Sequence, residues 1–127
     1  MTELPRTEAN IAEIQAFINE TKNRISEGVE IVFTAKSSNE LQDLALECDF
    51  SASAIEALMM SLTTDNYYRG IDPSGKSDFN VCAFCTLIEK ERMEIYLKFG
   101  LEVDGLQILL FSNHVPKFPM NRPFIDK

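Results

Sequence analysis

Several features that define other protein classes are missing from this chain of 127 residues. It has no apolar run of about eighteen residues or more, so we expect no membrane-spanning helix. Its first residues lack a basic segment followed by an apolar one, so we expect no signal peptide. The three cysteines show no disulfide framework spacing and fit a reducing compartment. These absences predict a cytoplasmic protein that does not contact a membrane.

Basic residues are also scarce. The chain has 12 lysines and arginines against 20 aspartates and glutamates, which gives a net charge of −8. Non-specific binding to nucleic acid depends on a basic surface, so we expect no direct DNA binding. Any contact with RNA would have to come from a local group of basic side chains.

The sequence contains no glycine-rich phosphate loop, no zincin motif and no Gly-x-Ser-x-Gly elbow. Its one spacing typical of metal or redox sites is Cys82-Ala-Phe-Cys85, which Cys48 and His114 could complete to a Cys₃His zinc set. Residues three apart in a strand point to opposite faces, so we interpret these cysteines as small buried apolar residues. We therefore expect no metal and no cofactor, with a zinc or redox site as the alternative.

The composition, 45% hydrophobic and 25% charged, predicts one globular domain over residues 1–127. The first half of the chain predicts mainly helices. The expected elements are a loose lead-in at 1–7, an amphipathic helix at Glu8–Ser26 with a solvated polar face that includes Arg24, a short strand at 29–34, a short helix at 37–48 and a helix at 52–62. The last helix carries an apolar stripe, which we interpret as core rather than as a methionine-lined ligand groove.

A strictly alternating stretch, 93–103, organises the second half. Leu97 and Phe99 fall on one side and Tyr96 and Lys98 on the other, which is typical of a strand with one buried face. Around it we expect a turn-rich loop at 63–77, a strand at 79–89 covered on both faces, a tight hairpin turn at Asp104-Gly105, a strand at 106–112 and an irregular tail at 115–127. The predicted fold is α+β, an antiparallel sheet with a three-strand C-terminal meander, a further short N-terminal strand and N-terminal helices packed on one face.

The polar face of the 93–103 strand is the predicted site. Tyr96 and Lys98 lie side by side on it, because alternate residues of a strand share a face. On its own this pair is unremarkable on a solvated strand. The residues that we expect to converge there are Tyr67, Tyr68 and Arg69 from the 63–77 loop, Tyr96 and Lys98, and the sole histidine, His114.

These residue types suit cleavage of an RNA phosphodiester. Lysine and arginine stabilise phosphate charge, tyrosines stack on bases or donate hydrogen bonds, and histidine titrates near neutral pH. In such a reaction one group takes the proton of a 2′-hydroxyl, the cations hold the non-bridging oxygens, and an acid protonates the leaving 5′-oxygen.

The order and spacing of several segments resemble the MqsR-like toxins of bacterial toxin–antitoxin pairs. The segments are Tyr67-Tyr68-Arg69-Gly70, Glu94-Ile-Tyr-Leu-Lys98, Ile108-Leu-Leu-Phe-Ser-Asn-His114 and Pro119-Met120-Asn121-Arg122-Pro123-Phe124. The resemblance covers roughly residues 10 to 124 and rests on this order rather than on one decisive motif.

This resemblance implies a RelE-type fold and a metal-independent endoribonuclease that cleaves mRNA. It also implies a cognate antitoxin that holds the enzyme inactive, often a zinc-binding, DNA-binding protein. On this basis Lys98 would be the phosphate-stabilising cation, with Tyr96 beside it and His114 at the end of the catalytic strand. Tyr68 and Arg69, with the neighbouring Tyr67, would contact RNA.

A second interpretation remains open from the residues themselves. The same sheet face could bind a protein partner without catalysis, with the tyrosines as interface anchors. The acidic charge favours this non-catalytic interaction domain, which could be a diverged homologue of the toxin.

Overall fold

The computed structural model describes residues 8–48, 51–73, 78–88 and 93–116. The elements in chain order are α1 (Glu8–Ser26), β1 (Ile31–Phe33), α2 (Ala35–Cys48), α3 (Ala52–Met60), the 3₁₀ turn η1 (Thr64–Asn66), β2 (Tyr67–Pro73), β3 (Phe79–Ile88), β4 (Met93–Glu102) and β5 (Ile108–His114). The predicted lead-in at 1–7 and the tail segment at 119–124 lie outside the described residues.

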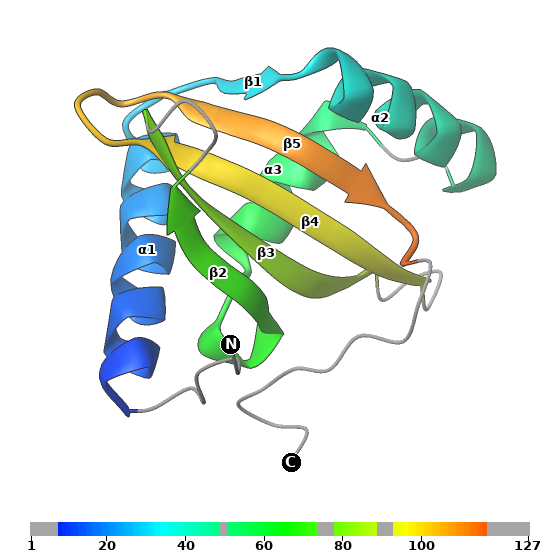
Figure 1. Ribbon diagram of the computed structural model, residues 1–127. Coiled ribbons are helices and arrows are strands. Elements are labelled where there is room, and N and C mark those ends of the chain that lie inside the picture. The colour runs from blue at the N-terminus through cyan, green and yellow to red at the C-terminus, as the bar shows by residue number, and fades with distance from the viewer. Residues whose placement is uncertain (1–7, 49–50, 74–77, 89–92, 117–127) are drawn as a thin grey trace.

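The strands form one sheet in the order β1-β5-β4-β3-β2. Strands β2 to β5 make an antiparallel meander, whereas β1 pairs in parallel with β5. Figure 1 shows α1 and α3 behind this sheet and α2 at the side formed by β1 and β5, where α2 contacts both strands. The predicted α+β class with helices packed on the sheet is confirmed. The parallel β1 makes the sheet mixed, which corrects the antiparallel prediction.

The core lies between the sheet and the helices behind it. On β4, Leu97 and Phe99 are fully buried, as their alternation predicts. The ring of Phe99 stacks on Phe84 of β3 at a centroid distance of 5.6 Å and contacts Phe17 of α1 at 5.5 Å. Burying a side chain of this size contributes about 1.5–3 kcal/mol. This aromatic cluster fixes β4, and therefore the orientation of its opposite face.

Helix α1 has the predicted bounds, while α2 begins two residues earlier than predicted. The reason is Thr34, whose side-chain oxygen accepts a hydrogen bond from the backbone N–H of Ser37 at 3.1 Å. The hydroxyl of Ser37 donates in return to the Thr34 carbonyl. Such a cap supplies partners for the first turn of a helix. Within the described ranges, α1 to α3 fall short of the length or apolarity that crossing a bilayer demands.

The loop prediction for 63–77 is wrong over most of its described part, because η1 and β2 occupy this segment. The pairing of β2 with β3 shifts register twice, between Tyr67 and Arg69 and between Gly70 and Asp72. These shifts break the two-residue alternation by which a strand is recognised in a sequence. Gly70 has φ 113°, and a Cβ there would lie 2.6 Å from the carbonyl oxygen of Val81. The predicted residues 74–77 lie outside the described part.

The β4–β5 connection is longer than the predicted tight turn. β4 ends at Glu102 and β5 begins at Ile108, while Val103 and Leu106 are 52% and 64% exposed. Arg24 of α1 was predicted to be solvated. It is buried instead, and it holds this connection in place. Its guanidinium donates to the carbonyl oxygens of Gln107 at 2.9 Å and Glu102 at 3.0 Å. The arginine therefore links both ends of the connection to α1, in addition to the backbone hydrogen bond from the Glu102 N–H to the Gln107 carbonyl at 3.0 Å.

A β-bulge in β5 decides which of its side chains reach the open face of the sheet. Phe99 pairs with Leu110 but Lys98 pairs with Ser112, so Phe111 is the extra residue. Paired residues of antiparallel strands point to the same face. Ser112 therefore shares the face of Lys98, and His114, which pairs with Tyr96, shares the face of Tyr96.

Candidate functional site

Three rings form a continuous row across the open face of the sheet. They come from Tyr68 of β2, Tyr96 of β4 and His114 of β5, and we call them the ring row. Tyr96 and His114 stack at a centroid distance of 5.0 Å with 28° between their planes. Tyr68 meets Tyr96 edge-on at 6.2 Å and 80°. The geometry is that of favourable aromatic pairs, so the three rings order one another.

The small residues of β3 allow the ring row to form. Cys85 pairs with Tyr96 across the strands and is 2% exposed. Because β3 presents only this small side chain here, Tyr68 can reach across it from β2 to Tyr96. Cys82 belongs to the core on the other face, so the two cysteines point to opposite faces as predicted. The side chain of Cys48 is outside the described part.

Two predicted cations flank the ring row. The guanidinium carbon of Arg69 lies 5.2 Å from the centroid of the Tyr68 ring. Lys98 is on the same face as Tyr96, and its ammonium lies 6.0 Å from the centroid of the Phe111 ring. Neither makes an ion pair with a carboxylate among the described residues. Both positive charges are therefore available to an anionic ligand on this face.

Tyr67 is not part of this arrangement. Its side chain is fully buried and meets the Phe84 ring edge-on at 6.5 Å. Its hydroxyl donates to the carbonyl of Gly70 within β2. The structure thus brings together five of the six predicted residues, and assigns Tyr67 to the core.

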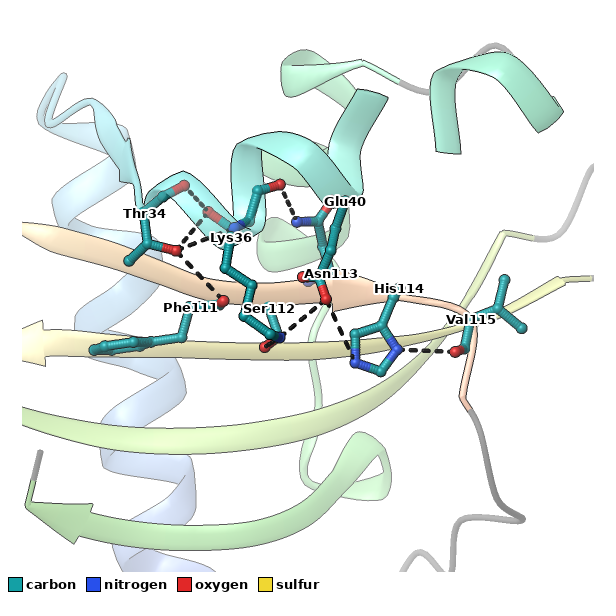
Figure 2. A network of polar contacts seen from close by, with 9 residues as sticks. Thr34, Lys36, Glu40, Phe111, Ser112, Asn113, His114 and Val115 are labelled. Atoms are coloured by element: carbon teal, nitrogen blue, oxygen red, sulfur yellow. Dashed lines mark hydrogen bonds and ion pairs between the residues drawn. The ribbon is translucent and has the colours of Figure 1, made fainter. Parts of the chain in front are cut away.

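Sequence reasoning missed two residues of this region, Lys36 and Glu40 of α2. Figure 2 shows them facing the C-terminal end of β5. The Lys36 ammonium donates to the Ser112 hydroxyl at 2.8 Å and to the Glu40 carboxylate at 2.9 Å. The other carboxylate oxygen of Glu40 accepts the backbone N–H of Asn113 at 3.0 Å. No local sequence pattern predicts these contacts, because they join segments more than seventy residues apart.

Asn113 strengthens the same connection between α2 and β5. It is fully buried, and its side-chain amide donates to the carbonyl of Ser37 at 2.9 Å. Its side-chain oxygen has no hydrogen-bond partner among the described residues. A buried amide held in this way fixes the backbone next to it. His114 is thus anchored through its neighbour as well as through its own ring contacts.

The hydrogen bond of His114 defines its neutral tautomer. Nδ1 lies 2.8 Å from the carbonyl oxygen of Val115. Because a carbonyl oxygen only accepts, Nδ1 carries the proton and the neutral ring has its lone pair on Nε2. Nε2 lies 3.9 Å from a carboxylate oxygen of Glu40. This separation is too long for a hydrogen bond and leaves Nε2 free to exchange a proton with a bound molecule.

Burial raises the pKa of the Tyr96 phenol above its ordinary value of 10.0. The neighbouring Tyr68 raises it further, Arg69 opposes the change, and the negative charge of Glu40 adds to it. At neutral pH this phenol is therefore protonated. It can donate a hydrogen bond or a proton, and it is not a base.

The open face can thus present a proton acceptor at Nε2 of His114, a proton donor at Tyr96 and two cations. The described residues contain no group of three or more metal-ligating side chains. A cavity of about 260 Å³ lies elsewhere, at the C-terminal end of α1 beside the β4–β5 connection, and is lined by Glu20, Asn23, Arg24, Glu27, Val29 and Leu106. Comparison of the chain with protein-family models, with curated proteins and with solved structures finds no match.

Proposed function

We propose that this protein is a metal-independent endoribonuclease of the MqsR-like, RelE-type class, the toxin of a toxin–antitoxin pair that acts on mRNA in the cytoplasm. The observation that carries the proposal is the Tyr96–His114 stack on the open face. Lys98 lies two residues from Tyr96 on the same face of β4. This arrangement places acid–base groups beside a cation that lacks a carboxylate partner in the described ranges. The order of the motifs along the chain supports the same class.

In the proposed reaction, Nε2 of His114 takes the proton of the ribose 2′-hydroxyl. The 2′-oxygen forms a bond to phosphorus, and the bond from phosphorus to the 5′-oxygen breaks. The Tyr96 phenol, which is protonated at neutral pH, gives its proton to the leaving oxygen. The products are a 2′,3′-cyclic phosphate and a 5′-hydroxyl, so no external reactant is needed.

The cations act on the phosphate during this step. Lys98 stabilises the charge that builds up on the non-bridging oxygens, which is where fixed positive charge lowers the barrier most. Arg69 and Tyr68 bind the flanking nucleotide, the arginine through a phosphate and the tyrosine through its ring. This local basic character offsets a net charge of −8. We propose that a cognate antitoxin covers the same face and blocks these contacts.

The test is induction of the full chain in a bacterial host, with growth recorded and the 5′ ends of transcripts mapped. Wild type is expected to stop growth and to produce new 5′-hydroxyl ends. Lys98→Ala and His114→Gln should each lower cleavage by about 100-fold or more. Lys22→Ala is the matched control, because it removes the same charge from α1 behind the sheet. Cleavage by the purified protein should persist in EDTA.

Circular dichroism and thermal unfolding of each purified variant establish that it is folded. The proposal fails if folded wild type leaves both growth and transcripts unchanged in a host without antitoxin. It also fails if Lys98→Ala cleaves as fast as Lys22→Ala.

The net charge favours a second candidate, a non-catalytic domain that binds a protein partner. Here the ring row anchors an interface rather than a nucleotide. This candidate predicts that no RNA is cleaved and that Tyr68→Ala abolishes co-purification of a defined partner. Lys98→Ala would leave that complex intact.

A further inference from the structure

We infer that Ser112 of β5 and Lys36 of α2 form the second half of a phosphate site, opposite Lys98 of β4. In this assignment Lys98 holds one non-bridging oxygen of an RNA phosphodiester, while the Ser112 hydroxyl and the Lys36 ammonium hold the other. The inference deepens the proposed function and rests on it for the identity of the ligand. The hydrogen-bond donors that it uses come from the geometry.

The first step in the argument is the state of the Ser112 hydroxyl. The Lys36 ammonium lies 2.8 Å from its oxygen. Because an ammonium only donates, the Ser112 oxygen is the acceptor in this pair, and its own hydrogen is left to donate elsewhere. Ser112 is 6% exposed, and no acceptor for this hydrogen lies among the described residues. Buried polar groups are hydrogen-bonded as a rule, so the oxygen of a bound ligand would complete this hydroxyl.

Lys36 also has a donor left over. An ammonium carries three N–H groups, and two of them have described acceptors, the Ser112 hydroxyl at 2.8 Å and the Glu40 carboxylate at 2.9 Å. The third has no acceptor in the described ranges. The Lys36 side chain is 64% exposed, so a ligand can reach it. Figure 2 shows this side chain extending from α2 to Ser112.

The register of the sheet places these donors opposite Lys98. Lys98 and Ser112 are paired across β4 and β5, and the Cβ atoms of such a pair lie about 4.5–5.5 Å apart on one face. The Lys98 ammonium lies 6.0 Å from the centroid of the ring of Phe111, the residue before Ser112. A phosphodiester has two non-bridging oxygens, and here donors from β4 and from β5 with α2 can approach it from two sides. Donors that include charged groups suit an anionic oxygen.

The site lies beside the acid–base groups without using them. Ser112 and His114 alternate on the open face of β5. Lys98 and Tyr96 alternate in the same way on β4. The phosphate donors therefore form a second row, about 6–7 Å along the strands from the ring row. Phosphate oxygens held in this second row leave Nε2 of His114 to the 2′-hydroxyl and the Tyr96 phenol to the leaving oxygen.

The alternative is a purely structural role, in which Lys36 connects α2 to β5. That connection already has two other hydrogen bonds. The backbone N–H of Asn113 donates to Glu40 at 3.0 Å, and its side-chain amide donates to the Ser37 carbonyl at 2.9 Å. An exposed lysine that pairs with a carboxylate four residues away contributes little to stability. We therefore expect the loss of Lys36 to change ligand binding far more than thermal unfolding.

The experiment measures binding separately from cleavage. Its probe is a mixed-sequence 2′-O-methyl RNA oligonucleotide, which lacks the attacking hydroxyl, and fluorescence anisotropy gives its Kd for the full chain over a range of salt concentrations. Ser112→Ala and Lys36→Met should each weaken binding by about tenfold, because each removes a donor to a charged group. Lys36→Met should also reduce the salt dependence, by up to about 0.7 in the slope of log Kd against log salt, the value for one phosphate contact on a single strand. Ser112→Ala removes no charge, so its slope should match that of wild type.

Lys22→Met, on α1 behind the sheet, is the control for the lost charge and should leave both Kd and slope unchanged. Lys36→Arg keeps a cation with several N–H donors and should retain most of the binding. Thermal unfolding is recorded for each variant. The inference is overturned if Lys36→Met binds as Lys22→Met does, or if Ser112→Ala has the Kd of wild type. A loss of binding that occurs only where the fold is lost also overturns it.

A free phosphate ion would present the same oxygens as an RNA phosphodiester. Backbone amide signals of residues 36 and 112 in NMR spectra of the full chain distinguish the two sources. We expect the oligonucleotide to shift these signals at micromolar concentration, and inorganic phosphate to displace it only at millimolar concentration. Signals that respond to inorganic phosphate and not to the oligonucleotide would overturn the assignment to RNA.

Cleavage of mRNA by the same variants separates this inference from the proposed function. Ser112→Ala and Lys36→Met should each lower kcat/KM by about 10- to 100-fold. If wild type cleaves no RNA but the two variants bind the oligonucleotide more weakly as expected, the proposed function fails and the phosphate site stands. If wild type cleaves RNA and both variants bind and cleave as Lys22→Met does, the phosphate site fails and the proposed function stands.

Discussion

The two faces of β4 are built in different ways. The face toward the helices consists of apolar side chains that alternate along the strand, among them the fully buried Leu97 and Phe99. The open face carries Tyr96 and Lys98, and its remaining groups come from β2, β5 and α2. One face is thus specified by a local pattern and the other by segments that meet only in the fold. Substitutions on the two faces should differ accordingly.

The largest effect should come from the core face. Phe99→Ala is expected to lower the free energy of unfolding by about 3–5 kcal/mol, because it leaves a cavity among packed rings. Tyr96→Ala, on the opposite face of the same strand, should cost less than half as much, since its ring is partly exposed. Urea unfolding of the two variants measures the difference. Equal losses would show that the ring row is as much a part of the core as the Phe99 cluster.

The next effect concerns two glycines with positive φ. Gly70→Ala should destabilise the fold by about 2 kcal/mol or more, because the new Cβ meets the Val81 carbonyl in addition to the backbone strain. Gly28→Ala has the same kind of backbone strain at φ 93°, but nothing lies within 4 Å of its Cβ. Gly28→Ala should lower the free energy of unfolding by about 1 kcal/mol. Thermal unfolding distinguishes the two, and a Gly28 effect as large as that of Gly70 would contradict the steric account.

A smaller effect is expected where α1 holds the β4–β5 connection. Arg24→Met removes two hydrogen bonds to backbone carbonyls and should cost about 1–3 kcal/mol. Lys22→Met on the same helix should stay within about 0.5 kcal/mol of wild type. Amide hydrogen exchange in β4 and β5 should rise in Arg24→Met alone. Unchanged exchange there would mean that the connection is held by other groups.

The smallest effect is the pH dependence of the open face. The pKa of Tyr96 is raised in the folded protein, first by burial and then by Tyr68, so the folded state holds this proton more tightly than the unfolded chain. Its contribution to stability is complete below about pH 10 and is lost as the pH rises through the folded pKa. Tyr96→Phe should therefore give a flatter stability curve above about pH 10. Urea unfolding from about pH 8 to 11 tests this; superimposable curves would contradict it.

The core could be predicted from the sequence because it depends on periodicity. The pattern of 93–103 identified β4 and its buried side, and the apolar positions of α1 gave the correct bounds of that helix. Strand β2 was missed because its register shifts at Tyr67 and Gly70 erase the alternation. The N-terminus of α2 was misplaced because its cap, Thr34, sits at the end of a segment that looked like strand.

The open face was predicted only in part. Tyr96, Lys98 and His114 were found from their residue types and motif order. Glu40 and Lys36 lie on a helix whose polar side is ordinary in sequence, and their significance depends on its approach to β5. Tyr67 and Tyr68 are adjacent in sequence, and only the pairing of β2 decides that one enters the core and the other the ring row.

The extra residue in β5 shifts, by one position, which of the following side chains face outward. Before Phe111 the odd positions of this strand face outward, and after it the even positions do. Without that shift, Asn113 would face outward and His114 would face the helices behind the sheet. The accessibility of the histidine is thus a matter of counting: deleting Phe111 alone would remove the bulge and keep His114 opposite Tyr96, whereas deleting Asn113 alone would turn the histidine toward the helices.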